Sequence, residues 1–140
     1  MIAGRGHRTR PHTADVMIEA WASTREDCME EAVSAFTSLF AEVPDGPAQR
    51  SVPFVLAPET DRELLVLLLE EVLYLVEVLG AIPYRCEVQP TEDGGIAGFF
   101  EVVDVSEVRL KGSVPKAVTR HELVFERRDE HWYCRVIVDV

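Results

Sequence analysis

Apolar residues recur at helical spacing in two stretches of the chain, which predicts two helices. The stripe of the first is formed by Met29, Val33, Phe36 and Phe40. The stripe of the second is formed by Leu64, Leu68, Val72, Leu75 and Leu79. Each stretch opens on a threonine, Thr24 or Thr60, with an acidic residue three positions later, and this spacing is typical of an N-terminal capping box. Gly80 fits the carboxyl end of the second helix, because glycine readily adopts the left-handed conformation found there.

The second helix is unusually apolar, but it is not predicted to cross a membrane. Its uninterrupted apolar run covers only residues 64–69 before Glu70 and Glu71 break it. A membrane-spanning helix needs about 20 apolar residues. The wide apolar face therefore predicts a central helix packed against a sheet.

The remaining apolar segments favour strands. A turn leading into a strand is predicted at 12–21, and further strands at 51–56, 84–88, 96–105, 108–110, 117–126 and 132–140. Pro53 indicates an edge strand, and residues 92–95 are typical of a hairpin turn. We therefore predict a single α+β domain, in which a mostly antiparallel sheet of about six to seven strands is covered by two helices.

Composition narrows the possible partners. The 140 residues carry 14 basic and 25 acidic side chains, for a net charge of −11. Such an acidic surface argues against broad binding to nucleic-acid backbones and favours a basic or metal-bearing partner. The exception is residues 1–10, which hold three arginines and no acid and are predicted to be a flexible basic tail. Cys28, Cys86 and Cys134 form no disulfide or zinc motif, so we expect buried thiols in a reducing compartment, the cytoplasm.

Candidate chemistry lies at predicted strand ends. Asp15, Asp139 and the carboxylate of Val140 would converge if the first and last strands pair, and Lys116 begins another strand. Clustered carboxylates repel one another and need a cation, either Lys116 or a divalent metal, and all-oxygen ligands suit Ca²⁺ or Mg²⁺. Ordinary structural roles remain open: Asp15 as a turn residue, Asp139 as a solvated strand end, and Lys116 as a charge that protects an edge strand.

Several segments together resemble the archease family. They are the HTADV run at 12–16, the EVLYL run at 71–75, Lys116 with the AVT that follows it, His121, Leu123, and the closing VIVDV run at 136–140. The likeness extends from Pro11 onward, so residues 11–140 are expected to form one archease-like domain. The chain departs from the family pattern at Arg120, where tyrosine is usual, and at residues 68–70, which read LLE instead of WLN. The segment 106–115 is also shorter than usual.

The resemblance implies a function. An archease assists an RtcB-type RNA ligase in tRNA splicing and RNA repair, where it promotes GTP-dependent guanylylation and repeated turnover of the ligase. It is an accessory protein, not an enzyme, and meets RNA only through the ligase, with no membrane involved. Carried over, the metal ligands are Asp15, Asp139 and Val140, the cation is Ca²⁺ with Mg²⁺ or Mn²⁺ as alternatives, and the catalytic contact is Lys116. Two competing hypotheses are a stand-alone metal-dependent phosphohydrolase and a chaperone-like binding module.

Overall fold

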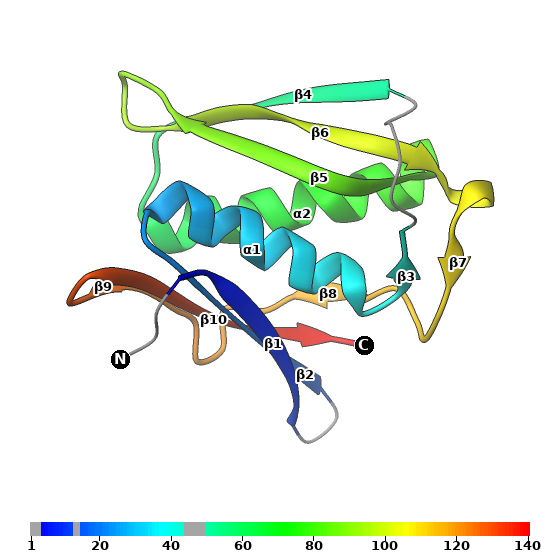
Figure 1. Ribbon diagram of the computed structural model, residues 1–140, viewed down its shortest axis with the longest axis horizontal. Coiled ribbons are helices and arrows are strands. Elements are labelled where there is room, and N and C mark those ends of the chain that lie inside the picture. The colour runs from blue at the N-terminus through cyan, green and yellow to red at the C-terminus, as the bar shows by residue number, and fades with distance from the viewer. Residues whose placement is uncertain (1–3, 13–14, 44–49) are drawn as a thin grey trace.

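The computed structural model describes residues 4–12, 15–43 and 50–140, which form three layers. Two helices, α1 (Arg25–Ser38) and α2 (Asp61–Leu79), lie between two antiparallel sheets (Figure 1). Sheet A runs in the order β1-β2-β10-β8, and β9 also pairs with β10. Its strands are β1 (Gly6–His12), β2 (Asp15–Ala22), β8 (Ala117–Val118), β9 (Val124–Arg128) and β10 (His131–Asp139).

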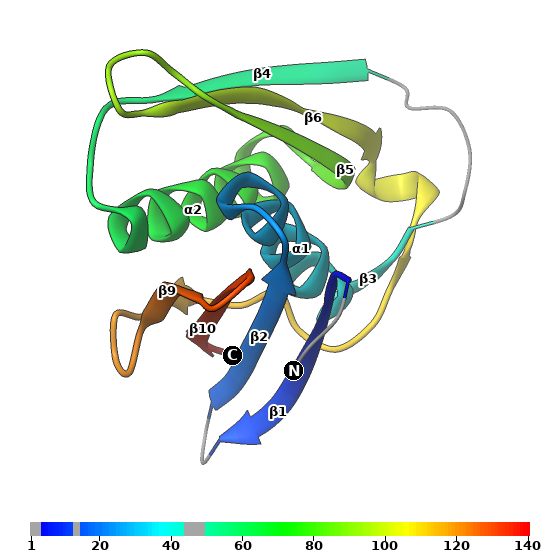
Figure 2. The same ribbon diagram turned by 60° about the vertical axis from the view of Figure 1, so that its left-hand side comes forward.

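The second main sheet, sheet C, runs in the order β4-β6-β5 on the far side of the helices (Figure 2). Its strands are β4 (Arg50–Leu56), β5 (Ala81–Pro90) and β6 (Ile96–Asp104). A short ladder joins β3 (Ala41–Glu42) to β7 (Arg109–Leu110), and a 3₁₀ turn at Val105–Glu107 precedes β7. The α+β prediction is confirmed, with both predicted helices and antiparallel pairing.

Local chemistry sets the ends of both helices as predicted. The Thr24 hydroxyl accepts a hydrogen bond from the Asp27 N–H at 3.1 Å, and the Thr60 hydroxyl accepts one from the Glu63 N–H at 3.2 Å. Gly80 ends α2 in the left-handed region at φ 60°. Both threonine N-caps and the glycine cap are therefore confirmed.

The sheet differs from the single layer that the sequence suggested. Helix α2 buries residues around much of its circumference, including Leu64, Val66 and Leu69, so one sheet alone would leave apolar surface exposed. Sheet C covers one side of the helices and sheet A the other (Figure 1). The strand predicted at 117–126 is also divided into β8 and β9, with Glu122 at φ 52° in the turn between them.

The predicted flexible tail needs correction. Residues 6–10 belong to β1, which pairs with β2 from Gly6 opposite Trp21 to His12 opposite Asp15. The arginines of this basic segment pair with acidic residues of β2 and α1, and these contacts hold the segment against the domain. Residues 1–3 of the predicted tail lie outside the described part of the chain.

Within the described residues, neither helix is both long and apolar enough to cross a membrane. Four of the five residues predicted to form the apolar stripe of α2 are in the core, since Leu64, Leu68, Val72 and Leu75 are at most 2% exposed. The fifth, Leu79, is the last residue of the helix and is 40% exposed, so the predicted stripe is wrong at this position.

Candidate metal centre

The two aspartates singled out from the sequence are direct cross-strand partners. Strands β2 and β10 pair along their whole length, and their last matched residues are Asp15 and Asp139. Directly opposed residues of an antiparallel pair project from the same face, with Cβ atoms about 4.5–5.5 Å apart. Val16 and Val138, the neighbours of these aspartates, pack with the core, so the carboxylates lie on the opposite, outer face of sheet A. The two side chains are both half-buried.

Lys116 and Val140 adjoin this pair. The Lys116 N–H donates a hydrogen bond to the Asp139 carbonyl at 2.7 Å, where β8 joins β10 with Ala117 opposite Asp139. The Lys116 side chain is exposed, and Val140 is 37% exposed. The structure thus brings all four predicted site residues to one end of sheet A.

The donor set fits a hard divalent cation. Two carboxylates and the oxygens of Val140 are the ligand type that Ca²⁺ and Mg²⁺ prefer. Among the residues whose side chains the structure describes, no group of three or more His, Cys, Asp and Glu side chains gathers as a metal cluster. Because Ca²⁺ takes six to eight oxygen ligands, a cation held here would keep coordination positions for water or for oxygens of another molecule.

A charged network covers the same face of sheet A farther along. Glu19 on β2 is only 4% exposed, although it is outside the core cluster. Its carboxylate accepts hydrogen bonds from Arg8 Nε at 2.7 Å and from Tyr133 Oη at 2.5 Å. Arg10 Nη1 is 3.5 Å from the same carboxylate. Burial opposes ionisation of Glu19, but the hydrogen bonds from Arg8 and Tyr133 outweigh it and lower its pKa. Burial and the bond to Glu19 raise the pKa of Tyr133 to about 12.

This network was not predicted from the sequence, although the alternation along β2 indicates it. Val16, Ile18 and Ala20 alternate along β2 and face the core, so the residues between them must share the outer face with Asp15. Glu19 is the acidic residue among them. Its partners Arg8 and Arg10 were not recognised because residues 1–10 were predicted to be a flexible tail.

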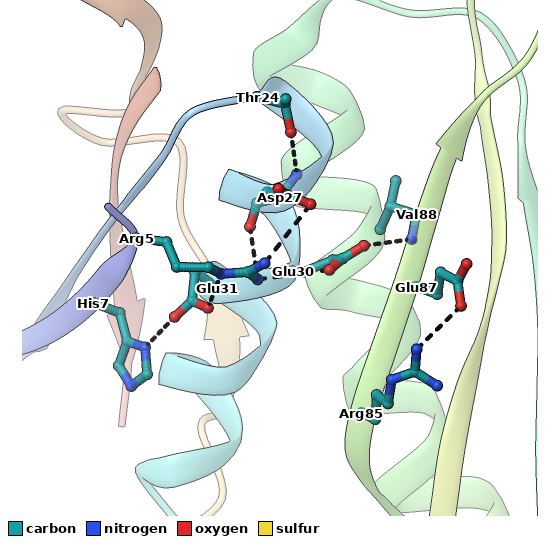
Figure 3. Close-up of polar contacts among 9 residues, drawn as sticks. All are labelled: Arg5, His7, Thr24, Asp27, Glu30, Glu31, Arg85, Glu87 and Val88. Carbon is teal, nitrogen blue, oxygen red and sulfur yellow. Dashed lines mark hydrogen bonds and ion pairs between the residues drawn. The ribbon is translucent and has the colours of Figure 1, made fainter. Parts of the chain in front are cut away.

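A second polar cluster fixes β1 and β5 to helix α1 (Figure 3). Arg5 Nε lies 2.5 Å from Glu31 Oε2, and His7 Nδ1 lies 2.8 Å from Glu31 Oε1. The neighbouring Glu30 lies 3.6 Å from Arg5 Nη2 and, toward β5, accepts a hydrogen bond from the Val88 N–H at 2.9 Å. This cluster is structural: it joins strands from both sheets to one helix, and it uses the arginine that begins the basic segment.

The cysteines are free and buried, in agreement with the sequence prediction. Burial raises the pKa of Cys86. A hydrogen bond between Cys134 and Cys28, together with burial, raises the pKa of Cys134. Thiols held in their neutral form are poor nucleophiles.

The chain matches one protein family and several curated proteins over nearly its whole length. The archease protein family (MTH1598/TM1083) matches residues 7–140. A probable protein archease of Mycobacterium tuberculosis is 39% identical over 135 residues, which cover 96% of this chain and 75% of that protein. A protein archease of Methanosarcina barkeri is 28% identical over 145 residues, covering 98% and 97%.

Two solved structures have the same fold. The solution structure of Methanobacterium thermoautotrophicum protein 1598 superposes with a TM-score of 0.77 at 21% identity, covering 96% of this chain and 99% of that one. The crystal structure of a Thermotoga maritima archease, described as a possible chaperone, superposes with a TM-score of 0.66 at 19% identity, covering 94% and 96%.

These observations define a small α+β protein with two helices between antiparallel sheets and an acidic pair where its first long strand meets its last. The match over residues 7–140 then identifies the family. The chain belongs to the archease family, as its sequence motifs predicted.

Proposed function

We propose that this archease activates an RtcB-type RNA ligase in the cytoplasm, promoting GTP-dependent guanylylation and repeated turnover of the ligase in tRNA splicing and RNA repair. The observation that carries the proposal is the direct pairing of Asp15 with Asp139 beside Lys116. Family membership supplies the partner. The chain acts as an accessory protein, and it meets RNA only through the ligase.

Asp15, Asp139 and Val140 would hold a divalent cation, Ca²⁺ in the first instance and Mg²⁺ or Mn²⁺ as alternatives. Such a cation supplies positive charge that orders phosphate groups for nucleotidyl transfer. The protein's own contribution is geometric. The β2–β10 ladder fixes the two carboxylates opposite each other, so little conformational freedom is lost when they close on a cation.

Lys116 would contact a phosphate oxygen from the neighbouring strand. Its main-chain N–H is bound to the Asp139 carbonyl, which fixes the base of its side chain while leaving the exposed ammonium free to extend. A lysine ammonium is a compact point charge with three donors, and it suits a phosphate whose position the metal has already defined.

The surface beside the aspartates favours a protein partner. At this end of sheet A, on the face that carries Val16, a hollow of about 280 Å³ is lined by Val16, Leu39, Gly112, Ser113 and Val140. Leu110, on the neighbouring β7, is 54% exposed. Apolar surface bordered by polar, solvent-accessible residues is the composition typical of a protein–protein interface.

The proposal is tested by following ligase–GMP formation with the RtcB-type ligase of the same cell, GTP and a divalent metal, with and without this protein. We expect the wild-type chain to stimulate guanylylation and Asp139→Ala to lose the stimulation while keeping the same circular dichroism spectrum. Asp129→Asn, in the β9–β10 turn, is the charge-matched control and should stimulate normally. Equal stimulation by wild type and Asp139→Ala would remove the aspartate pair from the mechanism.

The same preparations test the competing functions. Hydrolysis of phosphate esters by the purified chain alone would favour a phosphohydrolase, and activity only with the ligase favours the proposal. A chaperone-like module would suppress aggregation of unfolded proteins without any ligase. Wild-type chain that leaves the rate of ligase–GMP formation unchanged would contradict the activator role itself.

A further inference from the structure

Arg10 lies between two acidic groups on one face of sheet A. In the β1–β2 ladder Arg10 is opposite Met17, Arg8 is opposite Glu19, and His12 is opposite Asp15. Arg10 is therefore a diagonal neighbour of Glu19 in one direction and of Asp15 in the other. Diagonal neighbours are about 7–8 Å apart at Cα, which a long side chain can bridge.

The structure has Arg10 turned toward Glu19, but the contact is weak. Its Nη1 is 3.5 Å from Glu19 Oε1, whereas Arg8 Nε is at 2.7 Å from the same oxygen and Tyr133 takes the other oxygen at 2.5 Å. The Arg10 side chain is 59% exposed and the Glu19 side chain only 5%. Glu19 is thus largely occupied by its other two partners, and Arg10 keeps the freedom to move.

We infer that Arg10 is a built-in competitor for the cation at Asp15 and Asp139, and that Glu19 limits this competition by drawing Arg10 away. When the guanidinium points to Glu19, the aspartate pair is open to a divalent ion. When it points to Asp15, one of the two negative charges is already neutralised and the pair binds the ion less tightly. The inference rests on the proposed metal site and adds to it a residue that sets the site's affinity.

The effect has a predictable size. A guanidinium charge about 7–8 Å from a divalent ion changes binding by about sixfold at the dielectric constant of water, and by more at the lower effective value of a protein surface. Added salt should reduce this difference, because exposed charges are screened.

The test is calorimetric titration of the purified chain with Ca²⁺. At low ionic strength we expect Arg10→Gln to bind Ca²⁺ at least about sixfold more tightly than wild type. Glu19→Gln should bind more weakly, and the double variant should bind more tightly than Glu19→Gln alone, because the Arg10 guanidinium is then absent. Arg62→Gln, an exposed arginine on α2, makes the same change in net charge and should bind like wild type.

The outcomes separate this inference from the proposed function. If wild type binds Ca²⁺, Asp139→Asn does not, and Arg10→Gln matches wild type, the competitor role is wrong while the metal site stands. If Arg10→Gln binds where wild type does not, competition by Arg10 is supported. If neither chain binds Ca²⁺, both the inference and the metal site are overturned. Because Arg10 is exposed, its variant should fold even if Glu19→Gln does not, so the comparison with wild type remains decisive.

Discussion

The Glu30 carboxylate on α1 accepts a hydrogen bond from the Val88 N–H at 2.9 Å, on β5 at the edge of sheet C. An edge strand presents unpaired main-chain groups that invite pairing with other chains. Glu30 covers one of these groups with a side chain from the helix layer. The Glu30 carboxylate is partly buried in this position. Burial raises the pKa of Glu30, although the Val88 hydrogen bond and the nearby Arg5 lower it.

This relationship predicts an unusual pH dependence for Glu30→Gln. A carboxyl group whose folded-state pKa is raised contributes its stability fully below the unfolded-state pKa, and the contribution is lost as pH rises through the folded-state pKa. Glutamine keeps an acceptor for Val88 without a buried charge. We therefore expect the variant to melt a few degrees higher than wild type at pH 7, with a smaller difference near pH 4, measured by thermal denaturation.

Glu31→Gln is the matched control for that measurement. Glu31 is the neighbouring residue, but it pairs with His7 of β1 and with Arg5, which precedes that strand. Its substitution should lower the melting temperature at pH 7. A Glu30→Gln chain that is less stable than wild type at pH 7 would contradict the proposed cost of burying this charge.

The aspartate pair predicts opposite effects on stability with and without metal. Like charges directly opposite each other on paired strands are destabilising. Asp139→Asn should therefore stabilise the metal-free protein by roughly 0.2–1 kcal/mol. It should also abolish the rise in melting temperature that Ca²⁺ gives the wild type, since a ligand that binds only the folded state stabilises it.

Asp129→Asn makes the same charge change in the β9–β10 turn, at φ 55°, where asparagine is well tolerated. It should leave the Ca²⁺-induced rise unchanged. A Ca²⁺-induced rise that persists in Asp139→Asn would show that the cation binds elsewhere.

Gly98 predicts a backbone-controlled position in sheet C. A Cβ at this residue would lie 1.8 Å from the Glu87 carbonyl oxygen and 3.1 Å from the Phe54 ring. Main chain cannot move aside as a flexible side chain can, so Gly98→Ala should destabilise by at least about 1–3 kcal/mol in urea unfolding. Ala97→Val, at the preceding, half-buried position, should change stability far less. Similar midpoints for the two variants would contradict this account.

The sequence revealed what local chemistry and periodicity control. Thr24, Thr60 and Gly80 determine the helix ends through neighbours only a few residues away, so these were predictable. The pairing of Asp15 with Asp139 was also predictable as a hypothesis, because each lies beside a strand whose apolar pattern was clear.

What the sequence concealed depends on distant partners. The basic segment that contains β1 is typical of a tail when its sequence is considered alone. Only the structure shows that Glu19 and Glu31 lie beside its arginines. The break between β8 and β9 has no glycine or proline to mark it, and Glu122 adopts a positive φ there instead. The strands are divided between two sheets because α2 buries residues on more than one side. The periodicity of a single segment does not specify which strands cover which side.

The position of β10 in sheet A has a consequence for biosynthesis. This strand is the last element in the sequence, yet it lies in the interior of the sheet, between β2 and the short strands β8 and β9. Contacts between residues so remote along the chain form late and slow folding. During translation, β2 cannot pair with β10 until β10 has been synthesised, so Asp15 and Asp139 come together only at that stage.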